Sequence, residues 1–200
     1  MTNRLPVAIL AIVAAICAAQ TGAFAGASPA TQPGELRGKG IAFVCDASDT
    51  MIPKIDVVRR ELANTLDGMR PIDKFGVIFM RAKGCAQLDT RLLPATPANK
   101  EKGKTFVAAF KPGGSTDPIP AVEAAFKAKP DCIYLLADHD FPDGPALVAR
   151  IGALNRDRSV KVNTIALLGQ DDHDTDFMKA LQRIAEESKG TYRFVKASDL

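Results

Sequence analysis

Five side chains with oxygen donors lie in three short polar segments of the chain, each next to an apolar or helical pattern. Asp46, Ser48 and Thr50 fall within residues 46–51, whereas Thr116 and Asp138 lie in two later segments. The alternate spacing of the first three allows one loop to direct three side chains towards one centre. Carboxylates and hydroxyls are the donors that hard cations such as Mg²⁺ and Ca²⁺ prefer. The five residues therefore predict a site for one divalent metal ion.

The charge of this set predicts how a bound ion would behave. Few carboxylates, those of Asp46 and Asp138, belong to the set, so the protein would not saturate the ion with negative charge and the ion could accept one more anionic ligand. The octahedral preference of Mg²⁺ favours a shell completed by waters and by an oxygen from a partner. We expect Mg²⁺, with Mn²⁺ or Ca²⁺ as alternatives, and a protein partner that presents an Asp or Glu carboxylate.

Each residue also has a purely structural interpretation. Ser48 and Thr50 are residue types that cap helices, and Asp46 is typical of a hydrogen-bonded strand end. Ser115 precedes Thr116, which leaves open which of the two hydroxyls would be the ligand. Taken one at a time, these residues favour the structural interpretation.

Strand and helix patterns alternate along the part of the chain that would position the five residues. Apolar runs typical of buried strands cover residues 41–45, 75–80, 132–136, 160–168 and 191–195. Helical spacing of apolar residues covers residues 53–69, 99–110, 117–126, 145–155 and 174–188. A short segment at 85–88 would turn back through Lys83-Gly84 as a hairpin.

This alternation predicts an α/β fold. We expect a three-layer, doubly wound, mostly parallel sheet with helices on both faces and one short antiparallel edge strand. Ligands of such sheets bind at the carboxyl ends of the strands, where the strand order reverses. The segments that follow residues 41–45 and 132–136 are therefore expected at the binding edge.

In this order and at these spacings, the motifs resemble those of a von Willebrand factor A (VWA) domain over about residues 39–196. The metal-ion-dependent adhesion site (MIDAS) of that family has an Asp-x-Ser-x-Ser motif, a distant Thr after a Gly-rich turn and a distant Asp at a strand end. Those positions match Asp46, Ser48 and Thr50, then Thr116, then Asp138. The resemblance implies that the hydroxyls coordinate the metal directly and that the Asp residues act partly through water. It favours the metal site over the structural interpretation.

Several positions depart from the family pattern. Thr50 replaces the usual last Ser, and Asp49 stands where Gly is common and would add a negative charge near the site. Ala137 and His139 flank Asp138 where a Thr and a Gly are typical. These departures concern the affinity for the metal and the choice of metal more than the fold.

Other activities find less support in the residues. The net charge of +3, the scattered Lys and Arg residues and the absence of Trp argue against nucleic-acid binding. A haloacid-dehalogenase-like phosphatase could use Asp46, but it would need a second acid at position 48 and a lysine, for which Lys104 and Lys111 have no clear context. We therefore expect a monomeric binding module without enzymatic activity, with a metal-free structural VWA domain as the main alternative.

The N-terminal segment has the pattern of a targeting sequence. Arg4, the apolar run at 5–17 and the small residues of Ala23-Phe24-Ala25 predict a signal peptide over residues 1–25. Residues 26–38 would form a flexible tether and residues 39–200 the domain. We expect export to the periplasm or the exterior of a bacterium without membrane insertion after cleavage. A retained anchor is the alternative.

The remaining polar residues give weaker indications than the five oxygen donors. Cys45, Cys85 and Cys132 form an odd set without a CxxC pair, which argues against a disulfide framework and a zinc knuckle. The loop at residues 171–174 is expected to be solvated, with Asp174 capping the next helix; the alternative is that it tunes what docks at the site or holds a second cation.

Overall fold

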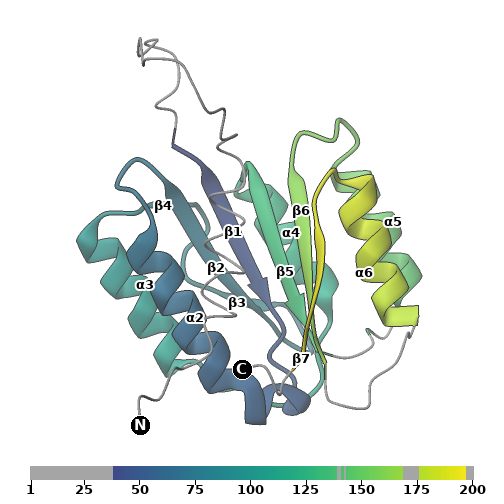
Figure 1. Cartoon of the computed structure of the whole chain (residues 1–200), viewed down its shortest axis with the longest axis horizontal. Helices are drawn as coiled ribbons and strands as arrows, with labels where there is room; N and C mark the ends of the chain where they lie inside the picture. Colours follow the sequence, from purple (N-terminus) through teal and green to yellow (C-terminus); the bar gives the residue numbers. More distant parts are fainter. Residues whose placement is uncertain (1–37, 139–140, 142, 169–175, 197–200) are drawn as a thin grey trace, which may run out of the picture.

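The computed structural model describes residues 38–138, 141, 143–168 and 176–196 (Figure 1). The strands are β1 (Gly40–Cys45), β2 (Lys74–Met80), β3 (Cys85–Gln87), β4 (Leu93–Pro94), β5 (Cys132–Ala137), β6 (Lys161–Leu168) and β7 (Tyr192–Lys196). The helices are the 3₁₀ helix η1 (Asp49–Lys54) and the α-helices α2 (Ile55–Gly68), α3 (Pro97–Ala109), α4 (Pro118–Lys127), α5 (Gly144–Leu154) and α6 (Asp176–Glu187). The predicted alternation of strand and helix is confirmed.

The sheet has the strand order β3-β2-β1-β5-β6-β7, with β4 also paired to β2. β1, β2, β5, β6 and β7 run parallel, whereas β3 and β4 run antiparallel to β2. The predicted antiparallel edge thus consists of two short strands and not one, because the two residues of β4 are too few to show an alternating pattern. β1 pairs with β2 on one side and β5 on the other, so the strand order reverses at β1.

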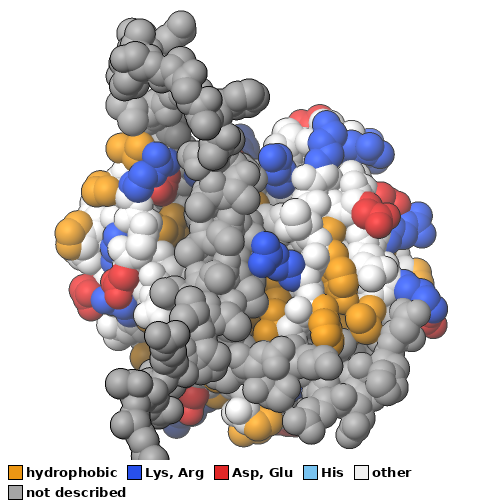
Figure 2. Space-filling view, in the orientation of Figure 1, with side chains coloured by type: hydrophobic (Ala, Val, Ile, Leu, Met, Phe, Trp, Pro, Cys, Tyr) orange, Lys and Arg blue, Asp and Glu red, His pale blue; other side chains and the backbone are white. Residues whose placement is uncertain are grey.

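Helices cover both faces of the sheet and produce three layers (Figure 1). Alternate residues of β1 point to opposite faces: Phe43 packs in the core under α2 and α3, and Val44 in the core under α4, α5 and α6. The predicted doubly wound α/β architecture is confirmed. Figure 2 shows Lys and Arg interspersed with Asp and Glu over the visible face of the domain.

The segment after β1 differs in detail from the prediction. The apolar stripe expected for this helix is present, since Ile55, Val58, Leu62 and Leu66 of α2 are buried. Pro53, however, lies inside η1 and does not open the α-helix. The chain therefore makes a tighter turn over residues 49–54 before α2 begins, which places Lys54 at the junction.

The predicted signal peptide, most of the tether, His139 and the loop at 171–174 lie outside the described residues. Among the residues that the structure does describe, no helix has the length and apolar character that crossing a membrane requires.

Candidate functional site

The site lies where β1 and β5 end, at the reversal of strand order. The backbone N–H of Asp46 donates to the carbonyl of Leu136 at 2.8 Å and so extends the pairing of the two strands by one residue. Asp138 follows β5 directly, and both aspartates are buried, with 0% and 3% of their surface exposed. The parallel sheet therefore brings two carboxylates that are far apart in sequence to one edge.

A loop between α3 and α4 brings Thr116 to the same edge. The N–H of Gly113 donates to the carbonyl of Ala47 at 2.8 Å, and Asp49 and Gly114 are joined in both directions. The N–H of Asp49 donates to the Gly114 carbonyl at 3.0 Å, and the Asp49 carboxylate accepts from the Gly114 N–H at 2.8 Å. Asp49 was expected to add negative charge to the site, but its carboxylate is directed at this loop and holds it in place.

Glycine is required at one position of the loop. Gly114 has a φ of 76°, a left-handed conformation that strains residues with a Cβ. After this turn, Thr116 is buried and its hydroxyl donates to Oδ1 of Asp46 at 3.2 Å, whereas Ser115 is exposed. The structure thus directs the hydroxyl of Thr116, and not that of Ser115, to the carboxylates. Asp117 caps α4 as predicted, accepting from the N–H of Ile119 at 2.9 Å.

The segment after β1 completes a continuous hydrogen-bonded cluster. Oδ1 of Asp46 accepts from the N–H of Ser48 at 2.9 Å. The hydroxyls of Ser48 and Thr50 are 2.8 Å apart, and the Thr50 hydroxyl donates to Oδ1 of Asp138 at 2.9 Å. Ser48 precedes η1 but its side chain makes no capping hydrogen bond, so the capping interpretation does not hold for Ser48. All five residues of the predicted site therefore lie in one cluster.

Lys54 also belongs to this cluster, and the sequence analysis missed it. Its ammonium group lies 2.7 Å from Oδ2 of Asp138 and 3.4 Å from the carbonyl oxygen of Leu167 in β6. The Asp138 side chain has 0% of its surface exposed and the Lys54 side chain 16%. From the sequence alone, a lysine just before a helix is interpreted as a solvated surface residue. The partner of Lys54, Asp138, is 84 positions away in the sequence. The one local indication that Lys54 has a negatively charged partner is its place at a helix N-terminus, where the helix dipole disfavours positive charge.

The donor types of the cluster fit a small, hard cation. Three hydroxyls and two carboxylates converge, which is the oxygen-rich chemistry that Mg²⁺ selects. Burial, together with the charge of Asp46, raises the pKa of the adjacent Cys45 thiol to about 12, and Cys45 packs in the apolar core under α2 and α3. Within the described residues, no group of three or more His, Cys, Asp or Glu side chains forms a separate metal site.

Of the two lysines considered for a phosphatase, Lys104 lies away from the cluster. The ammonium of Lys104 is 2.9 Å from Asp67 and 2.6 Å from Glu101, on the outer side of α2 and α3. Lys111 is exposed. The phosphatase would also need a second acid at position 48, where this chain has a serine whose hydroxyl is hydrogen-bonded to Thr50.

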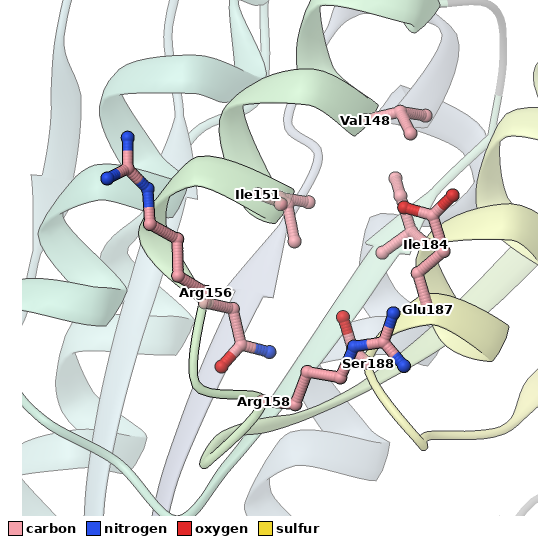
Figure 3. Close-up of a pocket in the computed structure, with 9 residues that line it drawn as sticks. Val148, Ile151, Arg156, Arg158, Ile184, Glu187 and Ser188 are labelled. Atoms are coloured by element: carbon pink, nitrogen blue, oxygen red, sulfur yellow. The ribbon is translucent and has the colours of Figure 1, made fainter.

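A pocket of about 260 Å³ lies between α5 and α6, away from the cluster. In Figure 3, Val148, Ile151 and Ile184 point into it, with Glu187 at its rim. The buried amide of Asn155, which also lines it, is hydrogen-bonded to the backbone of Val160 at 2.7 and 3.1 Å. Because α5 and α6 end here, the pocket lies at the amino edge of the sheet, opposite the cluster, and its lining combines apolar side chains with Arg156, Arg158 and Glu187.

Comparison with known proteins supports the fold. No protein-family model matches the chain. A von Willebrand factor type A structure from Catenulispora acidiphila is 19% identical, with a TM-score of 0.64, over 79% of this chain and 38% of that chain. The SpRpn10 VWA domain is 12% identical, with a TM-score of 0.59, over 79% of this chain and 88% of that chain.

A third structure, proximal thread matrix protein 1 from the mussel byssus, is 18% identical, with a TM-score of 0.60, over 78% of this chain and 41% of that chain. The chain therefore spans about two-fifths of the length of the first and third structures. At these identities the likeness concerns the fold. The fold is that of a VWA domain, as the resemblance of the sequence motifs implied.

Proposed function

We propose that this chain is an exported protein-interaction module that binds its partner through a divalent metal ion at the carboxyl edge of the sheet, without catalysing a reaction. The observation that carries this proposal is the connected cluster in which Asp46, Ser48, Thr116 and Asp138 are buried and Thr50 is exposed. When bound, Mg²⁺ would supply an electrophilic centre for a carboxylate of the partner. Mn²⁺ and Ca²⁺ are the alternative ions.

The chain's own residues would hold and orient that centre. The hydroxyls of Ser48, Thr50 and Thr116 contribute neutral donors, so only the two aspartates offset the charge of a divalent ion, and one of them is already paired with Lys54. The loop that Asp49 fixes places Thr116, and β1 and β5 place the aspartates. Ile52, which is 54% exposed in η1, lies close in sequence to these donors and would offer a partner an apolar contact.

Thermal unfolding with chelator, and then with Mg²⁺, Mn²⁺ or Ca²⁺, tests the metal. An ion bound only by the folded state at a hundred times its dissociation constant adds about 2.7 kcal/mol. For a domain of this size that raises the Tm by about 5–11 °C. We expect this shift in the wild type and its loss in Asp46→Ala. Asp73→Ala, which removes a buried carboxylate at the opposite edge, is the matched control and should keep the shift.

The partner chemistry needs its own test. Immobilised peptides that differ only in Asp against Asn, or Glu against Gln, should be bound in the acidic form alone and only with metal present. Binding that ignores both the carboxylate and the chelator would contradict the proposed recognition.

One observation favours a second candidate, a metal-free interaction module of the same fold. The ammonium of Lys54 already contacts Asp138 at 2.7 Å and supplies positive charge to the cluster. In that case the melting temperatures of the wild type would be the same with chelator and with each metal.

A further inference from the structure

We infer that Lys54 is an internal competitor for the divalent cation, so that metal binding requires its ammonium group to leave Asp138. This inference rests on the proposed metal site and concerns the residue that sets its affinity.

The ammonium group of Lys54 contacts one of the carboxylates that would bind the cation. Asp138 uses Oδ1 to accept from Thr50 at 2.9 Å and Oδ2 to accept from Lys54 at 2.7 Å. A metal ion drawn to this carboxylate therefore meets an ammonium that is already bound to it. The side chain of Asp138 is completely buried, so water screens the repulsion between the two cations only weakly.

The position of Lys54 in the chain supports a role in this pairing. Lys54 is the last residue of η1 and lies directly before the first turn of α2. The helix dipole and the exposed N–H groups of that turn disfavour a cation there. The second contact, to the Leu167 carbonyl at 3.4 Å, holds the ammonium across the ends of β5 and β6. The ion pair between Lys54 and Asp138 offsets the unfavourable interaction of the ammonium with the helix dipole.

Charge counting gives the direction of the effect. Asp46 and Asp138 contribute two negative charges to the cluster, and Lys54 neutralises one of them. Removing the ammonium restores the full attraction for a divalent ion. It also removes the ion pair between Lys54 and the buried Asp138 carboxylate, which destabilises the metal-free fold. Metal should therefore bind more tightly to a variant without Lys54 and should stabilise that variant more.

The test is Mn²⁺ titration calorimetry on the full chain with Lys54→Met, supported by melting curves in chelator and in Mn²⁺. We expect affinity for Mn²⁺ to rise by about tenfold or more, because a cation at a ligand carboxylate is removed. We also expect a lower Tm in chelator and a larger rise with Mn²⁺ than in the wild type. Lys104→Met is the matched control, since Lys104 pairs with Asp67 and Glu101 away from the site, and it should leave the affinity unchanged.

Two further variants keep the test decisive. Lys54→Gln removes the charge but can still donate to Asp138, so it should gain affinity even if Lys54→Met does not fold in chelator. The double variant Lys54→Met with Asp138→Asn should show no gain, because the competition acts through that carboxylate.

The outcomes separate this inference from the proposed function. If the wild type binds Mn²⁺ and neither Lys54 variant binds it more tightly, the competition is overturned and the metal site stands. If only the Lys54 variants bind Mn²⁺, the competition stands and the natural chain is the metal-free module. If no form binds Mn²⁺, both are overturned.

Discussion

Two pairs of aspartates lie at opposite edges of the same sheet and have different hydrogen-bond donors. Asp73 directly precedes β2 and Asp131 directly precedes β5, whereas Asp46 and Asp138 directly follow β1 and β5. At the amino edge, the Asp73 carboxylate accepts from the N–H groups of Lys39 and Arg70 at 2.9 and 3.0 Å and from the Arg70 guanidinium at 2.8 and 3.1 Å. Asp131 accepts from the N–H of Gly40 at 2.6 Å.

The difference between the edges lies in what occupies the carboxylate oxygens. At the amino edge the donors are backbone N–H groups and a guanidinium, which cannot serve as metal ligands and which fix the start of β1. At the carboxyl edge the donors include the hydroxyls of Thr50 and Thr116. A hydroxyl can turn its oxygen towards a cation. Aspartates next to strand ends thus stabilise the fold at one edge and form a candidate binding site at the other.

The largest expected effect on stability comes from Asp73→Ala. Loss of the charge-assisted hydrogen bonds should reduce the free energy of unfolding by about 2–4 kcal/mol. For a domain of this size the Tm should fall by about 5–15 °C. Chemical denaturation and calorimetry measure both, while the Mn²⁺-induced shift of the variant should equal that of the wild type. A loss of the metal shift in Asp73→Ala would show that the two edges are coupled and would break the comparison.

The same comparison shows how far the residues alone could predict this molecule. Hydrophobic spacing predicted five parallel strands and their helices, because burial of one helix stripe or both strand faces leaves a local pattern. The five oxygen donors could be found because strand ends converge at one edge. Lys54 could not, since its pairing with Asp138 depends on packing between distant segments. Asp73 was likewise missed as a buried carboxylate, because its hydrogen bonds with Lys39 form only after folding.

A pair of glycines tests the loop that positions Thr116. Gly114 and Gly84 have nearly the same φ, 76° and 75°, and a Cβ at either would meet no atom within 4 Å. Gly114→Ala and Gly84→Ala should therefore each cost about 1–2 kcal/mol of stability through backbone strain alone. Only Gly114→Ala should weaken Mn²⁺ binding, measured by calorimetry, because Gly84 lies in the turn between β2 and β3. Equal metal affinities in the two variants would show that the loop does not position the site.

A pair of buried threonines separates the role of a hydroxyl in the site from its role in the fold. The hydroxyl of Thr116 donates to Asp46, and that of Thr164 in β6 donates to the carbonyl of Leu181 at 2.9 Å. Replacement of either residue by Val keeps the shape and removes one buried hydrogen bond, at a cost of about 1 kcal/mol. Thr116→Val should also lose most of the metal-induced shift, and Thr164→Val should keep it. Retention of the full shift by Thr116→Val would remove this hydroxyl from the proposed metal shell.

The smallest expected effect is a pH dependence at the amino edge. Desolvation raises the pKa of Asp73, but hydrogen bonds from the Arg70 side chain and from the N–H groups of Lys39 and Arg70 outweigh it and lower the pKa below its ordinary value. A carboxylate with a lowered pKa in the folded state stabilises the protein above its unfolded pKa of about 3.9, and this stability is lost as the pH falls through the folded pKa. The difference in unfolding free energy between the wild type and Asp73→Asn should be constant near neutral pH and should narrow below about pH 4.

Asp157, whose pKa is lowered by its hydrogen bonds with Ser159, is fully exposed, so solvent screening should make the narrowing weaker for Asp157→Asn. If the difference in unfolding free energy from the wild type narrowed equally for Asp73→Asn and Asp157→Asn, burial at the amino edge would not strengthen the effect of the hydrogen bonds on stability.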